Sequence, residues 1–290
     1  MTFSSNTALV VEGGAMRGVF STGVLDAFLE REFNPFEACY GVSAGATNVA
    51  AYLARMHGRN LRVYIDYSLR PQFISVARFL RGGHLMDLDW LWEITIRELR
   101  LEIDTILNSR SHFFMALTRV RDGRPVYARP NARNLEQMLK ASSAMPVLYR
   151  RFVPVDAIDS DNTTEDPFVD GGLADPIPVI EAHRRGATRI VVLRSRPREF
   201  RMKPKPPNPL LRFGLRRYPE LLACIAERPK RYNEALDFMR SPPPGCEVIE
   251  VTPPESFESS RLTRDRARLE RDYHRGLQKG HELVARWTEA

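Results

Sequence analysis

Apolar positions in the first fifty residues alternate between short continuous runs and stripes with helical spacing. Residues 7–11 (TALVV) form a compact apolar run typical of a buried strand, and residues 36–42 (FEACYGV) form a second one. A glycine-containing turn follows each run, and apolar residues at helical spacing then continue to about Arg31 and about Met56. Two successive strand-turn-helix units predict a mostly parallel α/β sheet.

The middle of the chain gives weaker signals. Residues 57–112 show no clear period, although Phe73–Arg81 (FISVARFLR) mixes bulky apolar and basic side chains. A hairpin signal follows, with the turn at Asp122-Gly123. The further expected elements are a helix from an N-cap at Asn131 to about Ser142, strands at 151–155 and 166–169, and a helix at Pro176–Arg185. A strand rich in β-branched residues follows at 187–194, and we expect it to be the last strand of the main sheet.

The composition changes after residue 194. Residues 195–209 hold five prolines and many positive charges, as in a linker or a surface crossing. Beyond them we expect a helical stretch near 210–240, a short strand at 247–251 and a long final helix from about Thr263. The predicted organisation is an α/β domain at 1–194, a Pro-rich linker at 195–209 and a mainly helical C-terminal region at 210–290.

Composition and charge indicate the environment of the protein. The 290 residues have an ordinary globular composition, and no apolar run approaches the roughly 20 residues that cross a bilayer. The polar start of the chain is unlike a signal peptide, so we expect a cytoplasmic protein, in peripheral contact with a membrane at most. The net charge of +7 indicates either an anionic partner, a lipid surface or a nucleic acid, or simply an arginine-rich composition. No interleaved basic-aromatic motif supports nucleic-acid binding, which we do not expect.

A G-x-S-x-G pentapeptide stands at 41–45, with Ser43 between Gly41 and Gly45. An apolar strand precedes it and a helix pattern follows it, which is the context of a nucleophile elbow. The chemistry needs small neighbours because the backbone at such a serine is strained and crowded. The N-terminus of the following helix favours a developing negative charge.

Residues 13–18 (GGAMRG) occupy the first strand-to-helix turn, where backbone N–H groups can face an oxyanion or a phosphate. A dinucleotide-binding turn is the alternative. It fits poorly, because Ala15 stands at the second glycine position of that pattern and the acidic Glu37 is not clearly at a strand end.

Asp170, Gly171 and Gly172 end the apolar strand PFVD. An aspartate at a strand end followed by two glycines leaves its carboxylate open to a cleft. The alternative is an ordinary turn aspartate, as in the Asp-Gly turns of hairpins. Taken alone, the segment favours the second interpretation.

Four segments together resemble the patatin-like phospholipase family over about residues 8–194, in that family's order. They are EGGAMRG at 12–18, GVSAG at 41–45, ASSAMP at 141–146 and DGG at 170–172. Their wording, and that of the C-terminal third, is most similar to an uncharacterised bacterial branch. The resemblance implies a three-layer α/β sandwich with a mostly parallel central sheet, followed by a C-terminal helical region.

The resemblance also implies a Ser-Asp dyad, with Ser43 as nucleophile and Asp170 as base. The amides of Gly13, Gly14 and Ala15 would form the oxyanion hole, and Arg17 would hold that loop or attract a phosphate. The family usually has a third glycine where this chain has Ala15, and alanine tolerates positive φ badly. The supporting positions are Gly18, Gly41, Gly45, Gly171 and Gly172.

A Ser-His-Asp triad is the alternative to the dyad. It requires the fold to place one of six histidines beside Ser43, and none has a recognisable triad context. Neither the histidines nor the cysteines make a metal-binding pattern, so we expect buried or reduced thiols and no cofactor. The histidines are His57, His84, His112, His183, His274 and His281, and the cysteines are Cys39, Cys224 and Cys246.

We therefore expect a serine lipid acyl hydrolase that cleaves fatty acyl esters through an acyl-enzyme. The alternatives are a thioesterase, lysophospholipase or other esterase with the same residues, and a non-catalytic lipid-binding protein. The expected partners are a lipid ester and an anionic membrane surface. Phe73–Arg81 is either a membrane-facing or lid segment or an amphipathic helix packed on the core, and the second interpretation is favoured.

Overall fold

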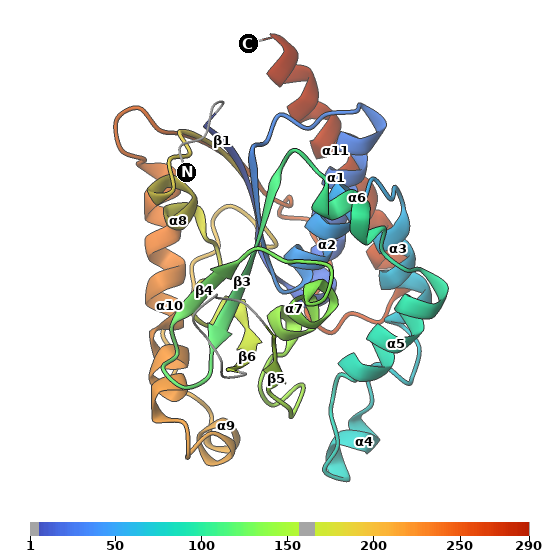
Figure 1. Cartoon of the computed structure of the whole chain (residues 1–290), viewed down its shortest axis with the longest axis vertical. Helices are drawn as coiled ribbons and strands as arrows, with labels where there is room; N and C mark the ends of the chain where they lie inside the picture. Colours follow the sequence, from blue (N-terminus) through green and yellow to red (C-terminus); the bar gives the residue numbers. More distant parts are fainter. Residues whose placement is uncertain (1–5, 157–165, 290) are drawn as a thin grey trace.

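The computed structural model describes residues 6–156 and 166–289. Figure 1 shows a central sheet with helices on both faces, so the expected α/β sandwich is confirmed. Residues 1–5, which carry most of the polar start of the chain, lie outside the described residues. The strands are β1 (Thr7–Val11), β2 (Ala38–Val42), β3 (His112–Arg119), β4 (Pro125–Ala128), β5 (Val153–Pro154), β6 (Pro167–Asp170), β7 (Arg189–Leu193) and β8 (Glu247–Val251).

The strand order is β5-β6-β3-β2-β1-β7-β8, and β4 pairs with β3 outside this path. The neighbours from β3 to β8 are all parallel, whereas β4 and β6 run antiparallel to β3. Every residue of β1 and β2 is buried, because helices cover both faces of the sheet. Parallel strands in such a position read as continuous apolar runs, which is why the sequence revealed them.

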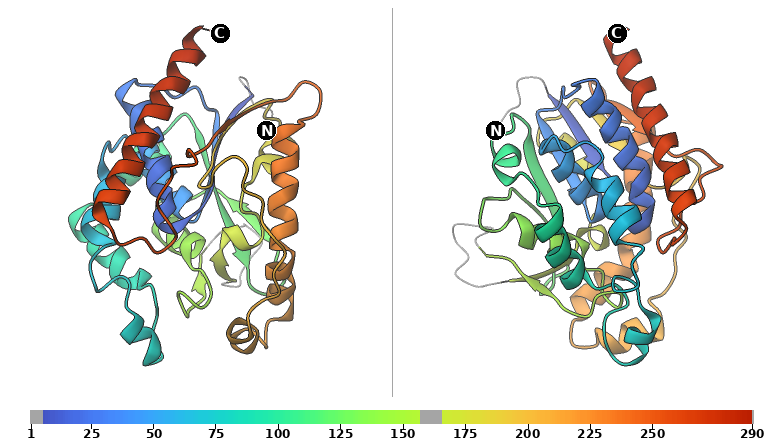
Figure 2. Two further views of the ribbon diagram at one scale, coloured as in Figure 1. Left: turned by 180° about the vertical axis from the view of Figure 1, so that it is seen from behind. Right: turned by 90° about the vertical axis from the view of Figure 1, so that its right-hand side faces the viewer.

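Helices form a layer on each face of the sheet (Figures 1 and 2). On one face lie α1 (Val19–Glu30), α2 (Ala44–Leu53), α7 (Leu135–Ser143) and α11 (Arg266–Glu289). The other face is covered by α8 (Val179–Arg184) and α10 (Pro219–Arg240). The apolar core is divided accordingly: Phe20 and Phe28 belong to the first layer, and Tyr232 of α10 belongs to the second.

The final helix, α11, packs on α1 with almost no space between the two backbones. A methyl group on Gly276 would lie 2.0 Å from the carbonyl oxygen of Phe20, and one on Gly23 would lie 2.1 Å from that of Tyr273. The buried hydroxyl of Tyr273 also donates a hydrogen bond of 2.9 Å to Asp26 of α1. The C-terminal helix is therefore part of the main helical layer.

Two expected elements differ from the structure. Strand β8 pairs with β7 along all five residues, so residues 187–194 are not the last strand of the sheet, and that expectation is wrong. The half-buried edge strand β8 carries little apolar signal of its own. The helix expected to start at Asn131 starts instead at Leu135, because the Asn131 side chain accepts the N–H groups of Arg133 and Asn134 and closes a turn first.

Residues 57–112 form short helices rather than one long element. They are α3 (Arg59–Arg62), a π-helical turn (Val63–Tyr67), α4 (Val76–Leu80), α5 (Leu88–Glu98) and α6 (Ile103–Leu107). Another short helix, α9 (Pro209–Gly214), lies at the end of the Pro-rich segment. Phe73 and Ile74 are buried, but α4 itself has no buried residue. The favoured interpretation of Phe73–Arg81, an amphipathic helix packed on the core, is therefore wrong for the helical part of this segment. None of the helices in the described part of the chain combines the length and apolar character that a bilayer crossing requires.

Candidate active site

Ser43 occupies the sharp turn between β2 and α2. Its φ of 54° and ψ of −125° are a backbone conformation that a residue with a side chain adopts only under strain. Glycine is required on both sides: a methyl group would lie 2.4 Å from the Ala46 Cα at Gly41 and 2.3 Å from the Val11 carbonyl oxygen at Gly45. The turn therefore holds the serine at the carboxyl end of the sheet, ahead of the first turn of α2.

A buried serine of α7 fixes this turn. The backbone N–H of Ser43 donates a hydrogen bond of 2.9 Å to Ser142 Oγ, which in turn donates one of 2.8 Å to the carbonyl oxygen of Ala116 in β3. Ser142 belongs to the ASSAMP segment, and sequence reasoning assigned it no individual role. Its link to Ser43 spans 99 positions of the chain, so no local pattern indicates it.

Asp170 reaches Ser43 because both adjoin the same edge of β3. Val42 pairs with Ala116, and Asp170 pairs with the next residue, Leu117. Strand β4 occupies the opposite edge of β3 at these positions, so β2 and β6 share one edge in succession. The ends of β2 and β6 therefore meet, and the carboxyl group of Asp170 accepts a hydrogen bond from the Ser43 side chain.

The carboxyl group of Asp170 is almost completely buried, with 3% of the residue exposed. Burial raises its pKa above the ordinary value, because water no longer stabilises the charge, while hydrogen bonds from Ser43 and from the Gly172 N–H act in the opposite direction. The Gly172 bond is 2.8 Å long and orients Oδ1. A carboxylate whose pKa is raised is a stronger base than one in water.

The Gly-rich turn lies directly against the serine. A methyl group on Gly13 would lie 2.9 Å from the Ser43 Cβ. Within residues 6–156 and 166–289, the N–H groups of Gly13, Gly14 and Ala15 make no hydrogen bond. Three donors without an acceptor beside a nucleophile are the arrangement that an oxyanion hole requires.

Ala15 has a φ of 49°, in the left-handed region. This is the position where the family usually has glycine, and the structure gives the reason, since glycine adopts this conformation without strain. The alanine methyl group leaves the N–H in place. The departure from the family pattern therefore costs backbone strain, on the order of 1–2 kcal/mol, and leaves the donor available.

The side chain of Arg17 supports the Gly-rich turn through hydrogen bonds to Ser195. It is 3% exposed, and its guanidinium donates to the Ser195 carbonyl oxygen at 3.0 Å and to Ser195 Oγ at 3.2 Å. Ser195 Oγ then donates to the Gly13 carbonyl oxygen, and the Ser195 N–H donates to Glu12. Burial lowers the pKa of Arg17 to about 9. Of the two roles considered for Arg17, these contacts fit loop support rather than phosphate binding.

The remaining predicted glycines also lie at close contacts around the site. A methyl group on Gly18 would lie 2.3 Å from the Tyr64 hydroxyl, and one on Gly171 would lie 2.1 Å from the Ala116 carbonyl oxygen. All the site positions predicted from the sequence are therefore brought together in one place.

A single cavity connects these groups to an apolar interior. Ser43, Asp170, Gly13 and Gly14 line its polar end. Its apolar wall comes mainly from α5, α7 and the segments beside them, and includes Phe73, Met86, Leu88, Leu91, Trp92 and Leu139. The residues 57–112, which had no clear sequence pattern, thus build much of the wall.

No histidine of the described residues lines this cavity. His57 and His281 each lie 3.0 Å from a carboxylate oxygen of Glu30, and His84 stacks on Tyr149. In the same part of the chain, no three His, Cys, Asp or Glu side chains are grouped to hold a metal ion. The geometry offers Ser43 no imidazole partner there.

Besides Arg59 of α3, two further arginines that sequence reasoning did not single out line the cavity. They are Arg228 in α10 and Arg261 in the segment before α11. Both come from the C-terminal region, and only the folding of that region onto the sheet brings them to the site.

Comparison with known proteins identifies two matched regions. The sequence profile described as "Patatin-like phospholipase" matches residues 9–183, which include Ser43 and Asp170. A second profile, described as a domain of unknown function (DUF6363), matches residues 218–290, which include α10, β8 and α11.

Relatives and one solved structure are also similar to the chain. "Uncharacterized protein YjjU" of Escherichia coli (strain K12) is 35% identical over 282 residues, covering 96% of this chain and 77% of that protein. "Triacylglycerol lipase 4" of Saccharomyces cerevisiae is 30% identical over 126 residues, covering 35% of this chain and 14% of the yeast protein. The crystal structure of VipD from Legionella pneumophila aligns with a TM-score of 0.40 and 14% identity, over 97% of this chain and 68% of VipD.

Proposed function

The chain belongs to the patatin-like phospholipase family of carboxylic ester hydrolases, and from this premise we propose that it cleaves fatty acyl esters of lipids through a Ser-Asp dyad. The observation that carries the proposal is the contact between Ser43 on its strained turn and the buried carboxyl group of Asp170. Both lie at the polar end of a cavity whose interior is apolar, as an acyl chain requires.

The reaction follows from the chemistry of these groups. Asp170 accepts the proton of the Ser43 hydroxyl, and the serine oxygen attacks the ester carbonyl. The N–H groups of Gly13, Gly14 and Ala15 bind the negative oxygen of the tetrahedral intermediate. Asp170 gives the proton it accepted to the departing alcohol, which leaves the acyl-enzyme. Water then loses a proton to Asp170 and attacks the acyl-enzyme, and Asp170 returns this proton to Ser43 as the fatty acid is released.

A fluorophosphonate probe tests whether Ser43 is an activated nucleophile. We expect stoichiometric labelling of the peptide that contains Ser43, measured by mass spectrometry, because the dyad makes that hydroxyl reactive. Heat-denatured protein is the control and should not be labelled. Absence of labelling in the folded protein would favour a non-catalytic lipid-binding protein.

A panel of phospholipid, lysophospholipid, triacylglycerol and acyl thioester substrates distinguishes among the activities that these residues support. We infer an ester of a long-chain fatty acid, since the cavity wall is built from large apolar side chains.

We also propose reversible contact with anionic membranes through α4 and α9. Both helices lie at the same end of the molecule (Figures 1 and 2). They expose large apolar side chains: Val76 is 62%, Leu80 80%, Leu210 54% and Phe213 67% exposed. Exposed basic residues lie within or close to these helices in the sequence, namely Arg81, Lys203, Lys205, Arg212, Arg216 and Arg217. An apolar surface with basic neighbours fits the interface of an anionic bilayer.

Vesicle sedimentation measures this contact. We expect stronger binding to anionic than to neutral vesicles, and weaker binding at high salt, since each basic residue near the surface contributes about 1 kcal/mol that salt screens. Leu80→Asp with Phe213→Asp should reduce binding, whereas Ile180→Asp, an exposed apolar position on α8, is the matched control. Equal binding to neutral and anionic vesicles would contradict the electrostatic part.

A further inference from the structure

Arg228 is a cation of the cavity wall. Its Nε donates to the carbonyl oxygen of Gly172, two residues beyond Asp170, and one terminal nitrogen faces the Met202 sulfur at 3.8 Å. Among the described residues, no carboxylate lies within ion-pairing distance of the Arg228 guanidinium. Its remaining donors are therefore available at the polar end of the cavity, where Ser43 lies.

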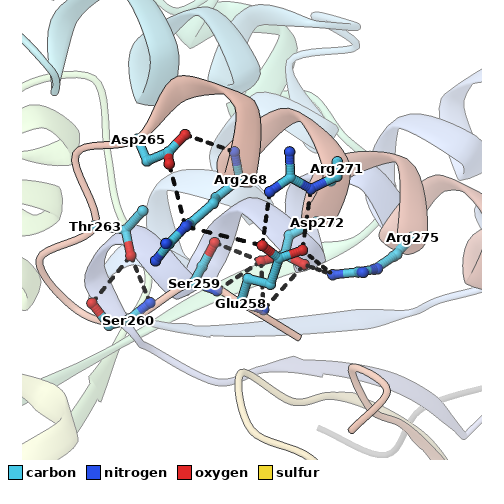
Figure 3. A network of polar contacts seen from close by, with 9 residues as sticks. All are labelled: Glu258, Ser259, Ser260, Thr263, Asp265, Arg268, Arg271, Asp272 and Arg275. Carbon is cyan, nitrogen blue, oxygen red and sulfur yellow. Dashed lines mark hydrogen bonds and ion pairs between the residues drawn. The ribbon is translucent and has the colours of Figure 1, made fainter. Parts of the chain in front are cut away.

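Arg261 lines the same cavity. The segment on either side of it, with Ser259, Ser260 and Thr263, is held by hydrogen bonds to α11 and within itself (Figure 3). The fully buried carboxylate of Asp272 accepts the N–H groups of Glu258 at 3.1 Å and Ser259 at 2.8 Å, and the Ser259 hydroxyl at 2.7 Å. Beyond Arg261, Thr263 Oγ1 accepts the N–H of Ser260 at 2.7 Å. The backbone is thus fixed on both sides of Arg261.

The segment that contains Arg261 is also bonded to the residue that follows the Gly-rich turn. The carbonyl oxygen of Arg261 accepts the N–H of Met16 at 3.4 Å, one residue after Ala15. No side-chain hydrogen bond or ion pair of Arg261 is present within the described ranges. The backbone of Arg261 therefore places its guanidinium in the cavity that contains Ser43, and the N–H groups of this guanidinium remain available to a ligand.

Among the described residues, no ion pair balances the charge of Arg228 or Arg261. Burial and the positive charge of Arg261 lower the pKa of Arg228, while Asp170 opposes this shift. The other acid that acts on Arg228, Glu12, is already bonded to Ser195 and Tyr232 and lies 3.7 Å from Arg194. Two arginines kept together without anions are stabilised when a substrate brings a negative group, and phosphate matches the donor pattern of guanidinium.

We propose that Arg228 and Arg261 bind the phosphate of a phospholipid headgroup while Ser43 attacks the acyl ester. This inference rests on the proposed function. It gives the C-terminal region matched by the profile of unknown function a role in substrate choice. Arg228 and Arg261 act on substrate binding and not on proton transfer. A role limited to balancing the charge of Asp170 would affect all esters alike.

The test compares two short-chain esters below their aggregation concentrations, so that no lipid surface takes part. Dihexanoyl phosphatidylglycerol carries the phosphate, and dihexanoylglycerol lacks it. We expect Arg228→Gln and Arg261→Gln each to raise KM for the phospholipid about 10-fold or more, with kcat changed little, because a charge-assisted hydrogen bond is lost. The neutral ester should keep its kcat and KM. Lys230→Gln and the exposed Arg264→Gln are the matched controls for loss of charge.

Three other outcomes would each contradict a different part of the proposal. Equal losses on both esters would overturn phosphate recognition and favour charge balance at Asp170. Inhibition of the neutral reaction by inorganic phosphate, without preference for the phospholipid, would overturn the headgroup assignment. If the parent protein hydrolyses neither ester, the proposed function itself fails. Circular dichroism of each variant controls for folding, and Arg228→Lys, which keeps the charge, should restore part of the phospholipid affinity.

Discussion

Replacing Ser43 by alanine or Asp170 by asparagine should lower kcat/KM for a p-nitrophenyl ester by about 10⁴-fold or more. A serine hydroxyl is a poor nucleophile at neutral pH without a base. Asparagine at position 170 can still accept the Gly172 N–H, which holds the side chain in place, but it cannot take the proton of Ser43. Circular dichroism checks that both variants are folded.

The double variant should be scarcely less active than either single variant, since nucleophile and base act as one unit. Each of the six histidines replaced singly by glutamine should leave most of the activity, in line with the absence of histidine from the lining formed by the described residues. A folded histidine variant as inactive as Ser43→Ala would replace the dyad with a Ser-His-Asp triad.

Proline at Ala15 should lower kcat by about 100-fold or more, because it removes one of the N–H donors assigned to the oxyanion. The structure adds a second cause. Proline requires a φ near −65°, whereas Ala15 has a φ of 49°, so the ring would also distort the turn. The measurement is kcat on the same ester, with thermal unfolding as a control.

Two further variants at Ala15 separate the donor from the geometry. Ala15→Gly keeps the N–H and removes the strain of the left-handed conformation, and it should keep or improve activity. Ala15→Val keeps the N–H but adds a β-branched side chain at positive φ, so its loss reports strain alone. If Ala15→Gly is folded and largely inactive, the turn does not bind the oxyanion. If Ala15→Val is as inactive as Ala15→Pro, geometry and not the donor explains the proline result.

The sequence was sufficient to predict the parallel sheet and the sharp strand-to-helix turn at Ser43, because both have local signatures. Buried parallel strands are continuous apolar runs, and the strained turn at Ser43 requires glycines at fixed offsets. The meeting of Ser43 with Asp170 has no such signature. It depends on β3, whose residues Ala116 and Leu117 pair with different strands on one edge.

Site residues that lie far along the sequence from the recognisable motifs could not be identified from the sequence. Ser142 supports the Ser43 turn from α7, and Arg261 reaches the cavity through a segment bonded to α11. A serine or an arginine in a helix-rich stretch is ordinary in sequence. The edge strand β8 was predicted, but its place beside β7 was not, since partner choice in a sheet is a property of the whole fold.

The glycine-lined contact between α1 and α11 joins almost the first helix of the chain to the last. The two helices stand far apart in the sequence, and without α11 the surface of α1 around Gly23 would be exposed to solvent. Arg261 arrives with the same final segment. The lining of the active site, to which Arg261 contributes, therefore depends on the packing of α11 on α1.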